Sequence, residues 1–358
     1  MKIAIYGGTF DPVTKGHIKV ARFAIETLNL DKLIFVPANI NPFKTQQKSE
    51  SAVDRLNMIK IVLEDKMEVS DFEIKRNGPS YTIETIKHFK NKYPNDELFL
   101  LIGSDNLVKI NKWHSIDEFN NYVKIKCFKR TPNINKINAK KYNIEILKNP
   151  LFPYSSTNFR NGQINCVDQR VMEYIGDKFL YIEEIIKNTV SHERYKHMKY
   201  AADYAVELAT LLNYPKKWAY YAALMHDITK EYSTEKHLAL IKKYYDSKLF
   251  VPTYKMHQLS AYVFLKHLYK VNNTFILEAI KCHTSLKDNL STLEKILYVA
   301  DKLCKGRAWP GIQAQRNLFL KDFDLGFKSL VKSIHEFLIS DGKEIEPEQI
   351  NVYQKWSK

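Results

Sequence analysis

A glycine-rich turn follows the first apolar run of the chain. The run "KIAIY" (2–6) leads into "GGTFDPVTKGH" (7–17), which contains Gly7, Gly8, Thr9 and Phe10. Glycines let a backbone approach a phosphate closely, and the free N–H groups at the start of a following helix favour an anion. His17, in the first turn of that helix, can donate to the same anion, and Thr14 offers a hydroxyl. The turn therefore predicts an anion-binding loop. It is neither a Walker loop nor a G-x-G-x-x-G fingerprint.

A second group of reactive side chains lies far along the chain. Eight of the eleven histidines come after residue 185. Four histidines and two aspartates there fall on, or next to, the apolar stripes of predicted helices: His197, His226, Asp227, His257, His283 and Asp301. Burying each of these polar groups separately would be costly, whereas one metal centre would satisfy them together. An aspartate in such a centre can bridge two ions while histidines take the end positions.

The elements that carry the first group alternate between strands and helices. Strands are predicted at 2–8, 32–38, 98–105 and 123–130, with helices at 16–29 and 52–65. This alternation favours a Rossmann-like α/β domain with a doubly wound parallel sheet. Ligands in such sheets bind at the C-terminal ends of the strands. The irregular segments that follow the strands are therefore expected to share one site.

The elements that carry the second group are helices alone. Apolar residues recur at helical spacing in "MKYAADYAVELATLL" (198–212) and "KKWAYYAALMHD" (216–227). The fold class is thus α/β plus all-α. We expect the domains to span 1–184 and 185–358.

The composition restricts the partners and the compartment. The chain of 358 residues carries a net charge of +15, without a long basic block, so we expect no specific nucleic acid as a partner. No apolar run is long enough to span a membrane, so no membrane association is expected. The four scattered cysteines fit reduced thiols in the cytoplasm. Association into a homo-oligomer stays open.

The first half resembles the nucleotidyltransferase family, and within it the bacterial nicotinate-nucleotide adenylyltransferases. The resemblance covers about residues 1–184 and rests on six ordered motifs: "GGTFDP" (7–12), "GH" (16–17), "GPSYTIET" (78–85), "LIGSDN" (101–106), "KWHSIDEF" (112–119) and "YSSTNFR" (154–160). It implies transfer of AMP from ATP to nicotinate mononucleotide, with release of pyrophosphate. Mg²⁺ would accompany the triphosphate and would not need a protein cage.

The same resemblance implies a role for each motif residue. His17, Thr14 and Arg160 are the expected catalytic residues, which bind the ATP phosphates from two sides. The expected substrate-binding residues are Gly7, Gly8, Thr9, Phe10, Lys44, Thr82, Asp105, Trp113, Ser155, Ser156 and Thr157. Asp105 would accept from a ribose hydroxyl, and Trp113 would stack on the pyridine ring. Thr14 stands where nicotinate-nucleotide enzymes usually carry His, so nicotinamide mononucleotide or phosphopantetheine stays open as the acceptor.

The second half resembles the HD-domain phosphohydrolases, and among them the YqeK-type diadenosine tetraphosphatases. The resemblance rests on "RYKH" (194–197), "ALMHDITK" (223–230), His257, "AIKCHT" (279–284) and "LYVADKL" (297–303). It implies two divalent metals, with iron the expected metal, held by His197, His226, Asp227, His257, His283 and Asp301. Lys230 and Arg307 would be catalytic residues that neutralise the phosphates of a dinucleoside polyphosphate, which is expected to yield two ADP. A regulatory domain that binds metal and nucleotide without turnover is the alternative.

Overall fold

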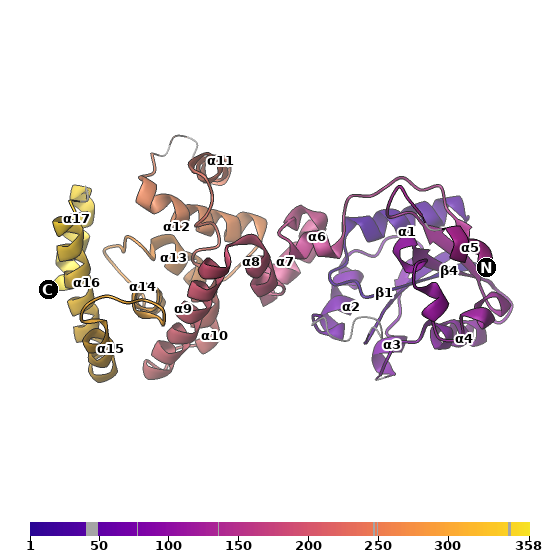
Figure 1. Cartoon of the computed structure of the whole chain (residues 1–358), viewed down its shortest axis with the longest axis horizontal. Coiled ribbons are helices and arrows are strands. Elements are labelled where there is room, and N and C mark those ends of the chain that lie inside the picture. Colours follow the sequence, from indigo (N-terminus) through magenta and orange to yellow (C-terminus); the bar gives the residue numbers. More distant parts are fainter. Residues whose placement is uncertain (41–48, 77, 135, 246–247, 249, 343–344) are drawn as a thin grey trace. The chain divides into compact units, whose positions relative to one another are not determined.

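A computed structural model describes residues 1–40, 49–76, 78–134, 136–245, 248, 250–342 and 345–358 (Figure 1). The chain divides into two compact units, Met1–Tyr174 and Ile175–Lys358. The expected boundary at residue 184 falls within a helix of the second unit, α8 (Ile182–Thr189). This helix buries Ile182, Ile185 and Ile186 and contacts the helices that follow it. The boundary between the two units therefore lies before α8 in the chain and not within it.

The N-terminal unit contains a sheet in which every described strand pairing is parallel. Its order is β3-β2-β1-β4-β5-β6. The strands are β1 (Lys2–Gly8), β2 (Lys32–Pro37), β3 (Met67–Val69), β4 (Glu97–Gly103), β5 (Lys124–Phe128) and β6 (Glu145–Ile146). The inner strands are buried on both faces, as in the run from Ile3 to Tyr6, because helices cover both sides of the sheet (Figure 1). The chain switches direction across the sheet between β1 and β4, which is where such folds bind ligands.

The helices of this unit connect successive strands or follow the last one. They are α1 (Lys15–Thr27), α2 (Ala52–Ile61), α3 (Phe72–Lys75), α4 (Thr82–Lys92), α5 (Lys136–Lys141), α6 (Ser156–Arg160) and the start of α7 (Gln169–Lys178). Short 3-10 turns cover Ser104–Asn106, Ile110–Lys112, Ile116–Asn121 and Ile164–Cys166. The Rossmann-like expectation is confirmed. The sequence missed β3 and β6, because three and two residues are too few to show a periodic pattern.

Among the described residues of the C-terminal unit, the regular elements are all helices, as expected. After α8 come α9 (His192–Leu211), α10 (Lys216–Met225), α11 (Thr234–Tyr244), α12 (Thr253–Val263), α13 (Thr274–Cys282), α14 (Thr292–Leu303), α15 (Ile312–Lys321), α16 (Phe323–Ser340) and α17 (Pro347–Ser357). The helix α14 is buried along most of its length and packs against α9, α10 and α13. Among the described residues, no helix has the length and apolar character that crossing a membrane requires.

Candidate active sites

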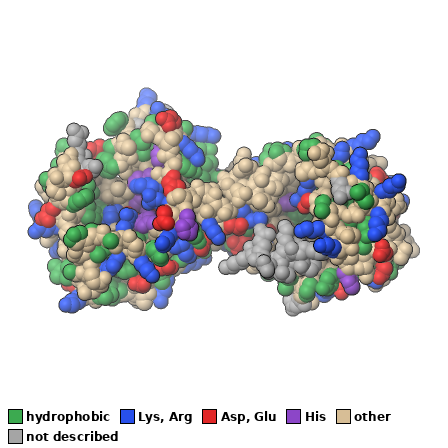
Figure 2. Space-filling view, in the orientation of Figure 1, with side chains coloured by type: hydrophobic (Ala, Val, Ile, Leu, Met, Phe, Trp, Pro, Cys, Tyr) green, Lys and Arg blue, Asp and Glu red, His purple; other side chains and the backbone are tan. Residues whose placement is uncertain are grey.

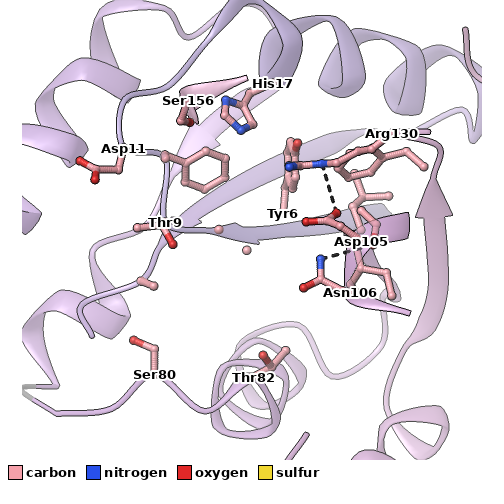
Figure 3. Close-up of a pocket in the computed structure, with 18 of the residues that line it drawn as sticks. Tyr6, Thr9, Asp11, His17, Ser80, Thr82, Asp105, Asn106, Arg130 and Ser156 are labelled. Atoms are coloured by element: carbon pink, nitrogen blue, oxygen red, sulfur yellow. Dashed lines mark hydrogen bonds and ion pairs between the residues drawn. The ribbon is translucent and has the colours of Figure 1, made fainter. Parts of the chain in front are cut away.

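A cavity of about 240 Å³ opens at the C-terminal ends of the strands in the N-terminal unit (Figure 3). It is lined by most of the residues that the sequence singled out: Gly7, Gly8, Thr9, Phe10, His17, Thr82, Asp105, Trp113, Ser155, Ser156, Thr157 and Arg160. Thr14 is not among the described residues that line it. Lys44 lies outside the residues that the structure describes.

The glycine turn presents bare backbone to this cavity. A Cβ added at Gly7 would meet nothing within 4 Å, so the backbone there faces open space. A Cβ at Gly8 would come within 3.0 Å of the Phe10 ring, which folds back over the turn. Phe10 itself has a φ of 50°, in the left-handed region. The turn therefore lets a ligand approach the main chain closely at Gly7, and the glycine at position 8 leaves room for the Phe10 ring.

Thr14 and His17 form a hydrogen-bonded pair at the start of α1. The backbone N–H of Thr14 donates to Nδ1 of His17 at 2.9 Å, and the Thr14 hydroxyl lies 2.9 Å from the same nitrogen. Since a backbone N–H can only donate, Nδ1 is an acceptor, and the proton of a neutral ring is on Nε2. Burial, with the nearby positive charge of Arg130, lowers the pKa of His17 to about 3. His17 is thus a neutral donor toward the cavity, and Thr14 lies behind it.

The segment at α6 ties the glycine turn to the other side of the cavity. Ser155 caps α6 by accepting from the N–H of Asn158 at 3.0 Å. The Ser156 hydroxyl donates to the carbonyl of Pro12 at 2.8 Å, and the buried Arg160 guanidinium donates to the carbonyl of Asp11. These contacts hold the two cavity walls together.

Two charged side chains meet at the end of adjacent strands. Asp105 follows β4 and Arg130 follows β5, and Nε of Arg130 lies 3.3 Å from Oδ1 of Asp105 (Figure 3). Both line the cavity. The sequence reasoning missed Arg130. Its position as the last residue of a predicted strand, like that of Asp105, was the available signal.

Polar and aromatic residues of α3, α4 and the following turns line the remaining wall. The wall includes Ser80, Thr82 and Trp113, and the Trp113 ring also packs on Phe119 with centroids 6.0 Å apart. Glu73 is buried here and accepts from the hydroxyl of Thr85 at 2.5 Å. Burial raises the pKa of Glu73 above its usual value. Trp113 is therefore both a packing residue and an accessible aromatic face.

In the C-terminal unit, four imidazole rings converge on two aspartates. Nε2 of His197 lies 3.0 Å from Oδ1 of Asp301, and Nε2 of His226 lies 3.6 Å from the same oxygen. The Nε2 atoms of His257 and His283 each lie 3.6 Å from Oδ1 of Asp227. The six residues predicted from helical stripes therefore lie together, although they come from α9, α12, α14 and the ends of α10 and α13.

In His226 and His283, the Nδ1 atom that faces away from the aspartates is held by a carbonyl oxygen at the end of the preceding helix. Nδ1 of His226 lies 2.6 Å from the carbonyl oxygen of Ala223, and Nδ1 of His283 lies 2.7 Å from that of Ile280. The last carbonyls of a helix have no partner within the helix, so they can accept from these rings. The Nδ1–H groups donate outward, and the Nε2 lone pairs point into the cluster, as metal-ligating histidines require.

Positive side chains surround the carboxylates. Arg194 donates to Asp227 at 2.7 Å, Lys302 to Asp301 at 2.5 Å, and Arg307 to Asp301 at 2.9 Å. Burial alone would raise the pKa of Asp301, but Lys302 and the neighbouring histidines lower it well below its usual range. The neighbouring His226 and His283 likewise lower the pKa of Asp227 well below its usual range. Both carboxylates are therefore ionised, as metal ligands must be.

A cavity of about 410 Å³ opens onto this cluster. Its charged lining includes Arg194, Lys230, Lys302 and Arg307, and its apolar lining is Trp309, Leu330 and Ile334. In the space-filling view, Lys and Arg side chains gather beside histidines on the face of this unit (Figure 2). The sequence reasoning did not assign a role to Arg194 or Trp309.

Comparisons with known proteins match both units. Residues 5–162 match the Cytidylyltransferase-like family and residues 194–306 match the HD domain. A protein of Mycoplasma pneumoniae named "Probable nicotinate-nucleotide adenylyltransferase/Ap4A hydrolase" is 32% identical over 345 residues, which cover 92% of this chain and 98% of the relative. The chain belongs to this two-domain family.

Other members and solved structures are also similar. The protein of the same name from Mycoplasma genitalium is 31% identical over 87% of this chain and 90% of its own length. A crystal structure of a predicted HD superfamily hydrolase from Clostridium acetobutylicum is 25% identical, covers 50% of this chain and 96% of its own, and has a TM-score of 0.46. The family assignment rests on the full-length relatives.

The cluster in this family member suits metal ions. His197, His226 and Asp227 form one group, and Asp227, His257 and His283 form another, each with ligand atoms within 4.8 Å of one another. Nε2 of His226 is fully buried and has no hydrogen-bond partner among the described residues. Asp227 belongs to both groups, and bridging of two ions by its carboxylate stays a prediction.

Proposed function

We propose that the N-terminal unit transfers AMP from ATP to nicotinate mononucleotide. The phosphate oxygen of the acceptor attacks the α-phosphorus of ATP, a new phosphoanhydride bond forms, and pyrophosphate leaves with the electrons of the broken bond. The substrate supplies the nucleophile, so the protein has to align two phosphates and stabilise the charge that develops on them. Mg²⁺ bound to the triphosphate would supply further charge neutralisation.

The observation that carries this proposal is the neutral His17 beside a bare glycine backbone. Its Nε2–H is a fixed donor that needs no proton transfer before it binds a phosphate oxygen. Arg160, Ser155, Ser156 and Thr157 are proposed to bind phosphates from the other wall. Asp105 is proposed to accept from a ribose hydroxyl, with Arg130 holding its carboxylate in place.

Trp113 and Thr82 support a pyridine nucleotide as the acceptor. An aromatic face next to hydroxyl groups fits a flat ring with a polar substituent. The decisive experiment is pyrophosphate release from ATP with each candidate acceptor in turn. Nicotinate mononucleotide should give the highest kcat/KM, and a preference for nicotinamide mononucleotide or phosphopantetheine would contradict the proposal.

We propose that the C-terminal unit hydrolyses a dinucleoside polyphosphate, with diadenosine tetraphosphate giving two ADP. His197, His226, Asp227, His257, His283 and Asp301 would hold two divalent metal ions, proposed to be iron. These ions would supply the activation of a water molecule for attack on phosphorus. Lys230, Arg307 and Arg194 all line the cavity and can neutralise the substrate phosphates.

Hydrolysis by the full chain distinguishes this activity from a regulatory role. The wild-type chain and Asp227→Ala are loaded with Fe²⁺ or Mn²⁺ and given diadenosine tetraphosphate. ADP formation by the wild type alone supports the hydrolase. If nucleotide binds without turnover at every metal loading, the unit is a sensor.

The proposed setting is the cytoplasm, where thiols are kept reduced, and the four buried free cysteines are consistent with it. The proposed partners are small molecules: ATP, nicotinate mononucleotide and a dinucleoside polyphosphate.

A further inference from the structure

The helix α17 (Pro347–Ser357) lies outside the residues that match the HD domain, yet its side chains bond to the loop behind a proposed metal ligand. The amide Nε2 of Gln349 donates to the carbonyl oxygen of Ser285. The indole Nε1 of Trp356 donates to the carbonyl oxygen of Lys287 at 2.8 Å. Both acceptors lie within four positions of His283, so α17 holds the backbone that follows this ligand.

The loop at Ser285 is also bonded to the helix that carries His257. Nε2 of Gln258 donates to the hydroxyl of Ser285 at 2.8 Å, and Oε1 of Gln258 accepts from the backbone N–H of Thr284 at 3.0 Å. Gln258 is adjacent to His257 in α12. The side chains of Gln258, Ser285 and Gln349 are all buried, with exposures of 4–5%. A continuous series of hydrogen bonds therefore joins α17 to the backbone segments that carry His257 and His283.

A second contact of α17 reaches α12 itself. Glu346, the residue before α17, accepts from the hydroxyl of Tyr254 at 3.0 Å and from Nζ of Lys255 at 2.6 Å. These residues precede His257 by one turn or less of helix. In addition, Leu286 is buried with a φ of 59°, a conformation that a leucine adopts only when its surroundings impose it. The contacts of α17 with Ser285 and Lys287 flank this residue.

We propose that α17 clamps the metal centre, with Gln349 as the positioning residue that fixes the backbone of His283 relative to His257. The two Nε2 atoms lie 3.2 Å apart, so a small shift of either backbone changes the spacing of the ligands. Partners that orient ligands without touching the metal contribute strongly to affinity. This inference rests on the proposed function, because it concerns the metal centre of the hydrolase.

The test is a Mn²⁺ titration of the full chain, without nucleotide, in which free Mn²⁺ is followed by its electron paramagnetic resonance signal. Gln349→Met keeps the length of the side chain and removes the donor. Its dissociation constant for Mn²⁺ should rise about fivefold, less than the roughly tenfold minimum for partners bonded directly to a ligand, because Gln349 acts through the backbone of Ser285. Gln354→Met, on the exposed side of the same helix, is the matched control and should bind like the wild type. Asp227→Ala, which lacks a ligand common to both metal groups, measures how much Mn²⁺ the chain binds outside this centre.

A second variant covers the case in which Gln349→Met does not fold. Trp356→Phe keeps an aromatic ring next to Phe327, whose centroid lies 5.7 Å from that of Trp356, and removes the donor to Lys287 together with part of the indole. It should also weaken Mn²⁺ binding, by a smaller factor. Denaturant unfolding of the metal-free proteins separates the two effects, because a purely structural role would lower stability without a change in Mn²⁺ affinity.

The outcomes separate the clamp from the proposed function. If both variants bind Mn²⁺ within twofold of the wild type, or if Gln354→Met is weakened equally, the clamp is wrong and the metal centre stands. If the wild type binds no more Mn²⁺ than Asp227→Ala, the metal centre itself is wrong, and the clamp falls with it.

Discussion

The backbone N–H of Thr14 and Nδ1 of His17 are 2.9 Å apart, which fixes the tautomer of the histidine at the phosphate cavity. The Thr14 hydroxyl lies at the same distance from Nδ1 and is buried behind the ring. The threonine that departs from the family pattern thus supports the reactive imidazole from behind. We propose that Thr14 is a positioning residue that acts through His17.

Replacement of Thr14 by valine should therefore lower the rate of adenylyl transfer only moderately. The backbone N–H still donates to Nδ1, so the tautomer is kept, while one of two restraints on the ring is lost. We expect kcat to fall about tenfold, which corresponds to about 1.4 kcal/mol, with little change in the KM for ATP. Thr14→Ser keeps the hydroxyl and should retain most of the activity. Steady-state pyrophosphate release measures both variants; a large rise in the KM for ATP in Thr14→Val would indicate direct phosphate contact instead.

The ionisation of His17 gives a pH prediction. Its pKa of about 3 in the folded chain lies below the ordinary value of 6.5 because burial disfavours the charged ring. A group with a depressed pKa contributes stability that is fully present above pH 6.5 and is lost as the pH falls toward 3. The His17 ring resonances should therefore show no titration between pH 5 and 8 in nuclear magnetic resonance spectra of the full chain.

The corresponding stability measurement uses His17→Gln, which has no ionisable group at this position. The wild type should lose more free energy of unfolding than this variant between pH 7 and pH 4. A His17 titration midpoint near 6.5 would show that the ring is solvated and would remove the argument for a neutral donor.

The proposed metal ligands of the C-terminal unit could be predicted from the sequence, because each lies on or next to an apolar stripe of a predicted helix. His257 and His283 lie 26 residues apart, yet both fall on the buried faces of their helices, and such faces must meet in a helical domain. Arg194 was also accessible, since it lies three residues before His197 and such pairs are neighbours on a helix surface.

Three other features of the two sites could not be predicted, because no helical or strand periodicity in the sequence reports on them. Trp309 lies between α14 and α15, where no helical or strand pattern predicts which way a side chain faces. The support that Thr14 gives to His17 depends on side-chain orientation at a helix start, and the sequence predicted a phosphate contact instead. The bonds of α17 to Ser285 and Lys287 depend on tertiary packing alone.

The two activities should be separable by single substitutions in the full chain. His17→Ala removes a donor to the charge that develops on phosphate, and losses of 10²–10³ in kcat, roughly, are typical of such donors. Diadenosine tetraphosphate hydrolysis should be unchanged. Asp227→Asn removes a charge shared by both proposed metal groups and should abolish hydrolysis, lower the bound metal and leave adenylyl transfer intact. Metal analysis and both assays on the same preparations check this; loss of both activities in a folded variant would contradict two independent sites.

Trp309 should determine whether the hydrolase selects nucleotides over bare polyphosphate. It is 36% exposed and, with Leu330 and Ile334, forms the apolar lining of a cavity that four Lys and Arg side chains also line. Stacking of a base on an aromatic ring contributes about 1–3 kcal/mol. Trp309→Ala should therefore raise the KM for diadenosine tetraphosphate about tenfold, while Trp309→Phe should keep most of the affinity. Inorganic tripolyphosphate, which has no base, should inhibit the wild type and Trp309→Ala equally, because the cationic side chains are unchanged. Equal weakening of tripolyphosphate would mean that the substitution disturbs the phosphate site and that Trp309 does not bind the base.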